Sequence, residues 1–300
     1  MRIGVSCRGL IQKYGYERGF AICRESGFDA VDLALSVYGK QEDPTDIYNA
    51  SQDEFEAYFA NIKKLADQAG IEISSTHGRV LTYTNEEEQC AYTRWVSQRD
   101  LAATRILGAP ACVIHPIIRS YWPDRWDDED FLFQINTELY NYLIPFAEAN
   151  GVKIATETMG KTKIGDGYQV SFFAHPRDIR KQFEILNSQS MTLCVDTGHT
   201  NEAHFWGAPS AGEMIRAMGE HVTLLHLHDN NGTADLHLDP ICDKRGGVDW
   251  PDVFDALDEI GYDGVYNFEI TWQRYGDVME DAARFRGKFL RYIVENRGRV

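Results

Sequence analysis

Short apolar runs alternate with longer amphipathic stretches along the whole chain, and this alternation is what most constrains the fold. The longer stretches have apolar residues three and four apart, as amphipathic helices do, most clearly at residues 53–69, 86–107, 131–150, 176–186, 251–260 and 278–296. The short runs are typical of buried strands and occupy residues 3–7, 30–35, 71–77, 111–115, 153–158, 192–196, 222–228 and 264–270. Eight strand–helix units in a chain of 300 residues, joined by right-handed crossovers, predict a (β/α)8 TIM barrel.

No linker, low-complexity segment or shift in composition divides the chain, so residues 1–300 are expected to form a single domain. An open, doubly wound sheet is the alternative α/β fold. The formal net charge of −16 is distinctly acidic. Such a surface repels phosphate backbones and anionic membranes, so neither nucleic acid nor a membrane is expected as a partner.

The chain enters its first expected strand at once, without the charged and apolar regions of a signal peptide. It also lacks an uninterrupted apolar run of membrane-spanning length. Its six cysteines are scattered, without a CxxC pair, and several lie in strand-like runs where cysteine is usually a small buried residue. A reducing cytoplasm is therefore the expected location.

Ionisable residues gather at the carboxyl ends of the expected strands. Alternation along each strand places them on the inward face; Ala155 and Glu157, for example, share one side. The carboxyl ends of all strands in a TIM barrel converge on one mouth, where the active sites of this fold are built. The last inward positions are His77, His115, Glu157, Asp196, His226 with His228, and Glu269.

Residues 222–250 hold the densest group of these side chains. His226 and His228 share one face of the expected strand, while Leu225 and Leu227 share the other, which suits contact with apolar helices. Asp235 and His237 follow two positions apart. Imidazoles and carboxylates at this density indicate a metal site, because a cation relieves both their repulsion and their desolvation. The alternative is a set of surface polar residues in a long loop.

An ordered series of short motifs spans nearly the whole chain. It reads THG (76–78), IHP (114–116), TETMG (156–160), VDTGH (195–199), HLHD (226–229), DLH (235–237) and FE (268–269). Each motif is weak by itself, but the ordered set resembles the xylose isomerase-like TIM-barrel superfamily. That superfamily contains sugar and sugar-phosphate isomerases and epimerases, inosose dehydratases and apurinic endonucleases.

The resemblance to the ketose 3-epimerases of this superfamily implies a metal site with mainly oxygen ligands. Such a set favours Mn²⁺ or Mg²⁺, with Co²⁺ and Zn²⁺ as further candidates, and no organic cofactor is expected. The implied ligands are Glu157, Asp196, His226 and Glu269.

The implied chemistry is proton transfer next to a carbonyl through a metal-stabilised enediolate of a sugar or polyol. Glu157 and Glu269 would exchange protons with opposite faces of that intermediate. His199 and Arg245 would contact substrate oxygens, although a local hydrogen bond and a solvated loop charge are their respective alternatives. Further candidates for substrate binding are His77, His115, His228, Asp235 and His237.

The sequence leaves three other functions open: a lyase or dehydratase, a non-catalytic protein and an apurinic endonuclease. A lyase or dehydratase acting on a keto-sugar, keto-inositol or 3-oxo-glycoside would need the same enolate and would then expel a β leaving group. A sugar-binding or subunit-assembly protein is a non-catalytic alternative, and homo-oligomerisation is compatible with any of these functions. Lys161, Lys163 and Arg177 are either a phosphate cradle or solvated loop charges.

The apurinic endonucleases use a larger ligand set that can hold up to three Zn²⁺ ions. All the residues that correspond to this ligand set are present in this chain. The excess of 46 Asp and Glu over 30 Lys and Arg weighs against a DNA-binding enzyme. The counterparts are His77, His115, Glu157, Asp196, His199, His226, Asp235, His237 and Glu269.

Overall fold

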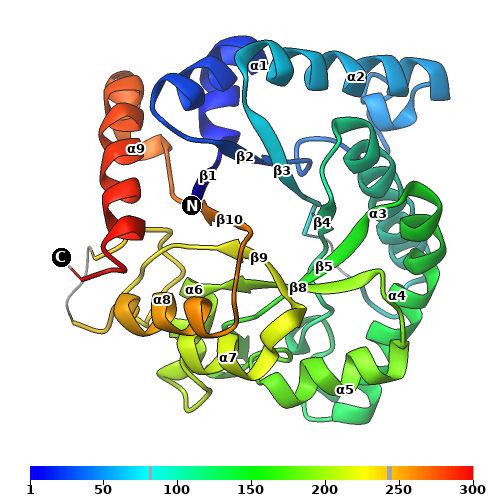
Figure 1. Cartoon of the computed structure of the whole chain (residues 1–300). Helices are drawn as coiled ribbons and strands as arrows, with labels where there is room; N and C mark the ends of the chain where they lie inside the picture. Colours follow the sequence, from blue (N-terminus) through cyan, green and yellow to red (C-terminus); the bar gives the residue numbers. More distant parts are fainter. Residues whose placement is uncertain (81–82, 242–244, 300) are drawn as a thin grey trace.

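A computed structural model of the protein describes residues 1–80, 83–241 and 245–299. Within these ranges eight parallel strands form one sheet in the order β10-β1-β2-β3-β4-β5-β8-β9. The two end strands meet at a parallel bridge between Leu227 and Phe268, where the Leu227 amide donates to the Asn267 carbonyl (2.8 Å). The sheet is thereby a nearly closed barrel, and the predicted TIM-barrel fold is confirmed (Figure 1). The strands are β1 (Arg2–Ser6), β2 (Ala30–Ala34), β3 (Glu72–His77), β4 (Ala111–Val113), β5 (Lys153–Glu157), β8 (Met191–Asp196), β9 (Val222–His226) and β10 (Val265–Phe268).

Helices surround the strands (Figure 1). They are α1 (Arg8–Glu25), α2 (Gln52–Ala69), α3 (Glu87–Leu107), α4 (Glu129–Asn150), α5 (Pro176–Leu186), α6 (Thr197–His204), α7 (Ala211–Met218), α8 (Trp250–Glu259) and α9 (Met279–Glu295). The sequence pattern did not single out α1, α6 and α7. Helix α1 is interrupted at Gly15, whose φ of 76° is non-helical, and α6 and α7 have only 8 residues each. Short 3-10 helices lie at Ile47–Asn49, Arg119–Tyr121, Pro123–Arg125, Gly219–His221 and Gln273–Val278.

Helix α2 illustrates how local sequence sets these elements. It begins at a capping box, in which the Ser51 side chain accepts from the Glu54 amide and the Glu54 carboxylate accepts from the Ser51 amide. It ends at Gly70, which has a left-handed φ of 68° that suits glycine. Phe55 and Phe59 lie on its buried face, as the apolar spacing predicts.

A two-stranded antiparallel hairpin, β6 (Lys161–Ile164) and β7 (Gly167–Val170), follows β5 and was not predicted. Ile164 pairs with Gly167, which leaves Gly165 and Asp166 as a two-residue turn. Gly165 has a φ of 58°, a conformation that glycine adopts without strain. The Gly-Asp dipeptide between two alternating runs was the signal available in the sequence.

Small side chains fill the lower interior of the barrel, and large ones pack between the strands and the helices. Ala111, Val113, Ala155 and Cys194 form a separate buried cluster. Leu225 and Leu227 belong instead to the main apolar core, which confirms the two faces predicted for this strand. The residues that follow Ala155 and Cys194 on the inward face are Glu157 and Asp196, so the polar mouth lies directly above this apolar floor.

The five cysteines among the described residues are buried and form no disulfide; Cys242 lies outside those residues. Over the same ranges, none of the helices has the length and apolar character needed to span a bilayer.

Candidate functional site

A cavity of about 490 Å³ lies where the carboxyl ends of the strands converge. Its wall is formed by strand ends and by the segments that follow them. Seven of the side chains expected at the site face it, together with others that the sequence did not indicate. The seven are His77, His115, Glu157, His199, Asp235, His237 and Glu269.

Glu157, the last residue of β5, lies at the centre of the cluster and is 1% exposed. Its Oε1 lies 2.6 Å from Nδ1 of His226. Its Oε2 lies 2.5 Å from Nε2 of His115 and 3.8 Å from Nε2 of His77. One carboxylate therefore joins imidazoles from β3, β4 and β9 because those strands end at the same level of the barrel.

Glu269 and Asp196 complete this inner group. Glu269 Oε2 lies 3.0 Å from the same Nδ1 of His226 that Glu157 contacts. Asp196 pairs with His226 in the β8–β9 register, which brings both side chains to the same side of the sheet. Potential ligand atoms of Glu157, Asp196, His226 and Glu269 all lie within 4.8 Å of one another.

The donor set fits a divalent cation. His226 Nε2 is buried and has no hydrogen-bond partner among the described residues, and the buried His115 Nε2 and Glu157 Oε2 contact each other (2.5 Å) without the alignment of a hydrogen bond. Buried ionisable atoms without partners are costly, and a cation held by their lone pairs would remove that cost. Cys194 also lies within reach of Glu157 and His226, but burial raises the pKa of its thiol to about 12. The four-residue group of Glu157, Asp196, His226 and Glu269 offers three carboxylates and one imidazole, so oxygen atoms dominate it.

Opposite charges in the inner group shift one another's pKa values. Burial alone would raise the pKa of Glu157, but the charges of His115 and His226 hold that pKa well below its usual range. Burial likewise opposes ionisation of Glu269, and the charge of His226 keeps its pKa low. The pKa of His226 is raised despite its burial, by Cys194, Glu269 and Glu157. Both glutamates are therefore ionised at neutral pH and can accept protons.

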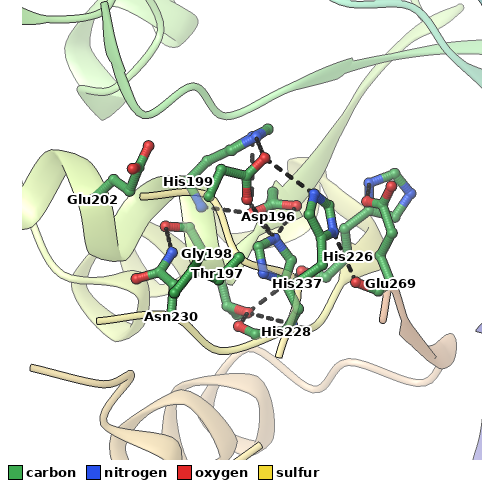
Figure 2. A network of polar contacts seen from close by, with 12 residues as sticks. Asp196, Thr197, Gly198, His199, Glu202, His226, His228, Asn230, His237 and Glu269 are labelled. Carbon is green, nitrogen blue, oxygen red and sulfur yellow. Dashed lines mark hydrogen bonds and ion pairs between the residues drawn. The ribbon is translucent and has the colours of Figure 1, made fainter. Parts of the chain in front are cut away.

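A second group lies beside the first, around Asp235. Asp235 Oδ2 is 3.0 Å from Nε2 of His237 and 3.6 Å from Nε2 of His199, and its Oδ1 is 3.7 Å from Nε2 of His228. The rings of His228 and His237 stack at 4.1 Å with an interplanar angle of 15°. Figure 2 shows His228 and His237 beside Asp196, with Glu269 next to His226.

The segment that carries Asp235 and His237 is folded back over the mouth. Asp229 organises it by accepting hydrogen bonds from the amides of Ile241 (2.9 Å) and Val248 (3.0 Å) and from the Trp250 indole (3.1 Å). His237 has a left-handed φ of 45°, and its Nδ1 lies 2.9 Å from the Glu269 carbonyl. Strained backbone of this kind persists where surrounding contacts over-determine it, and it is often found at functional sites.

Two of the candidates for substrate binding do not line the cavity. His228 is fully buried, and its Nε2 lies 3.0 and 3.1 Å from the two carboxylate oxygens of Asp196. Its contacts place it behind a candidate metal ligand, where it would hold that carboxylate in position. Arg245 is exposed and lies outside the cavity lining. The substrate-binding roles of these two residues therefore rest on the sequence alone.

His199 makes the local hydrogen bond that the sequence offered as the alternative to a substrate contact. Its backbone amide donates to Oδ1 of Asp196 (2.6 Å), so Asp196 caps the first turn of α6. Its Nδ1 lies 3.0 Å from the Thr158 carbonyl, and its ring still lines the cavity.

The charged cavity residues that the sequence did not indicate are Arg8, Asp32 and Arg79. Asp32 is 1% exposed and accepts a hydrogen bond from Ser75 Oγ (2.6 Å). It occupies an inward position of β2 between Ala30 and Ala34, so the alternation used for the other strands was a sufficient signal. Arg8 and Arg79 follow β1 and β3 directly, where loop direction is not readable from the sequence.

Gly198 is expected to be essential for the placement of His228. A Cβ at this position would lie 1.9 Å from His228 Cε1, so Gly198→Ala must displace the ring or helix α6. We expect the free energy of unfolding to fall by about 1–3 kcal/mol, measured by urea denaturation with chelator present. Gly167→Ala is the matched control, because its nearest neighbour would lie 3.9 Å away. Equal stability of the two variants would contradict the packing argument.

Comparison with known proteins matches this chain to a family. Residues 20–291 match the family model described as "Xylose isomerase-like TIM barrel". An uncharacterised protein of Methanocaldococcus jannaschii is 28% identical over 165 residues, which cover 54% of this chain and 51% of that protein. The chain thus matches about half the length of that relative.

Two solved structures share the fold over nearly their whole length. A D-tagatose 3-epimerase-like protein has a TM-score of 0.71 and 21% identity, covering 99% of both chains. A D-psicose 3-epimerase determined in the presence of D-fructose has a TM-score of 0.70 and 17% identity, covering 98% of this chain and 99% of the other. At such identities the likeness concerns the fold.

Proposed function

The chain belongs to the xylose isomerase-like TIM-barrel family, and we propose that it is a divalent-metal-dependent sugar isomerase or epimerase. The observation that carries the proposal is the group Glu157, Asp196, His226 and Glu269 at the mouth of the barrel. Two of its carboxylates, Glu157 and Glu269, also line the cavity and are therefore open to a substrate. The names of the two epimerase structures support a sugar substrate.

Glu157, Asp196, His226 and Glu269 would hold the ion. Three carboxylates and one imidazole favour Mn²⁺ or Mg²⁺, with Co²⁺ and Zn²⁺ as alternatives. When bound, such an ion supplies a Lewis acid that acidifies the C–H bond next to a ketone.

Glu157 and Glu269 would move the proton. They approach Nδ1 of His226 from two different strands, at 2.6 and 3.0 Å, and the low pKa of each keeps it ionised. An ionised carboxylate on each side of a planar intermediate can remove a proton from one face and return it to the other. His77, His115, His199 and His237, which also line the cavity, would orient the substrate hydroxyl groups.

Solvent exchange tests the proposal. The metal-loaded protein is incubated in D₂O with a panel of ketoses and ketose acids, and the products are followed by NMR. We expect deuterium at the carbon next to the carbonyl, together with an epimer or an aldose. Absence of exchange with the whole panel would contradict proton transfer as the core step.

Two alternative functions, a lyase and a nuclease, would give different results in related assays. A lyase or dehydratase would give exchange followed by an unsaturated product.

The larger set that includes His115, Asp235 and His237 converges on the same mouth, which is the observation in favour of a nuclease. The charge of −16 opposes it, so we propose that the protein neither binds nor nicks abasic duplex DNA at physiological salt. Catalytic incision would reverse this ranking.

A further inference from the structure

Two arginines line the cavity on one side of the barrel mouth. Arg8 is the first residue of α1, directly after β1, and Arg79 follows the end of β3 by two residues. Strands β1 and β3 flank β2, whereas β8, which carries Asp196, lies across the barrel from β2. The two guanidinium groups therefore face the end of the cavity away from Asp196.

Neither arginine has a carboxylate partner within the part of the chain that the structure describes. Arg8 makes no hydrogen bond or ion pair there. Arg79 donates through Nη2 to the Tyr38 carbonyl (2.6 Å), but its Nε is buried without an acceptor. Asp100 interacts with the Arg79 charge but receives its short side-chain hydrogen bond from the Tyr48 hydroxyl (2.5 Å). The buried Arg79 Nε lacks an acceptor, which is unfavourable, so an anion bound at this end of the cavity would be stabilised by it.

The acidic residues of the cavity do not supply that anion, because each is engaged elsewhere. Asp32 accepts from Ser75 Oγ (2.6 Å). Glu157 and Glu269 contact His226, and Asp235 contacts His237.

We propose that Arg8 and Arg79 form a subsite for an anionic group of the substrate, a carboxylate or a phosphate. The inference rests on the proposed function and adds to it the charge class of the sugar. Guanidinium groups present paired N–H donors that match the oxygens of these anions. Ser6 and Ser36 line the same cavity and offer hydroxyl groups to the remaining anion oxygens, whereas the Tyr92 hydroxyl donates to the Gly39 carbonyl (2.5 Å). Arg8 is exposed to solvent, and a neutral sugar would offer the buried Arg79 Nε no anionic acceptor.

The basic residues that the sequence offered as a phosphate cradle are placed differently. Lys161 lies 3.4 Å from Glu202, and both side chains are nearly buried. Arg177 is 71% exposed and pairs with Asp178 (3.3 Å). Neither lines the cavity, so Arg177 serves as the control for the arginine variants.

The test compares three ligands that share a keto end and differ at the sixth carbon: D-fructose, D-fructose 6-phosphate and D-fructuronate. Binding to the metal-loaded protein is measured by titration calorimetry, for wild type and for Arg8→Gln, Arg79→Gln and Arg177→Gln. We expect at least one anionic ligand to bind about 10- to 100-fold more tightly than D-fructose. Arg8→Gln and Arg79→Gln should reduce this preference by about 10-fold or more, whereas Arg177→Gln should retain it. The preferred ligand distinguishes carboxylate from phosphate.

Equal affinity for the neutral and anionic ligands, absence of binding by both anionic ligands, or a preference that survives both cavity variants would overturn the subsite. Turnover separates this result from the proposed function. Arginine-dependent binding without deuterium exchange in D₂O would retain the subsite and reject the isomerase. Exchange with D-fructose, without a preference for the anionic ligands, would retain the isomerase and reject the subsite.

Discussion

Glu157→Gln and Glu269→Gln are each expected to lower turnover by on the order of 10²–10⁴-fold, the typical contribution of a positioned acid or base. Glutamine keeps the size of the side chain and one coordinating oxygen but removes the basic carboxylate. Each variant should therefore retain measurable metal by elemental analysis. If the two residues serve opposite faces of the substrate, one variant should still exchange the acidic proton with D₂O without completing epimerisation.

Asp196→Asn is the matched control, because Asp196 belongs to the same four-residue group but does not line the cavity. It should fail mainly through weaker metal binding, so that excess Mn²⁺ restores part of the rate. Rescue of both glutamine variants to near wild-type turnover by excess metal would show that the glutamates are ligands only. The base would then be sought among His199 and His237, which line the cavity, and this would favour the lyase.

Removal of the divalent ion is expected to have an effect of similar size. Treatment with EDTA should reduce turnover by about 10³-fold or more, because several kcal/mol of transition-state stabilisation come from a Lewis acid. Addition of Mn²⁺ or Co²⁺ should restore it. Full activity in protein shown by elemental analysis to be free of metal would remove the basis of the mechanism.

Elemental analysis also gives the number of ions bound to each chain. The inner group of Glu157, Asp196, His226 and Glu269 predicts one ion for each chain. The neighbouring group of His228, Asp235 and His237 also has ligand atoms within 4.8 Å of one another. Two or three tightly bound ions would show that this second group binds metal too. Asp235→Asn should then lower the stoichiometry, whereas with a single ion it should leave the metal content unchanged.

The fold was predictable because its signals are local and repeated. The apolar stripe that includes Phe55 and Phe59, the capping Ser51 and the terminal Gly70 all act within one or two turns of α2. The hairpin β6–β7 was missed although its Gly165-Asp166 turn was present in the sequence. Helix α1 escaped for a different reason, because the break at Gly15 interrupts its period.

The sequence by itself determined which strand ends carry ionisable groups, since alternation along a strand assigns each side chain to one face. It thereby indicated Glu157, Asp196, His226 and Glu269, and the barrel brings these four together. Only the tertiary structure decided that His228 lies behind Asp196 and that Arg8 and Arg79 line the cavity without carboxylate partners among the described residues. The physical reason is that strand periodicity is a local property of the backbone, whereas the direction of a loop side chain depends on contacts far apart in the chain. The contacts of Asp229 with Ile241, Val248 and Trp250, which shape the segment carrying Asp235, are of that kind.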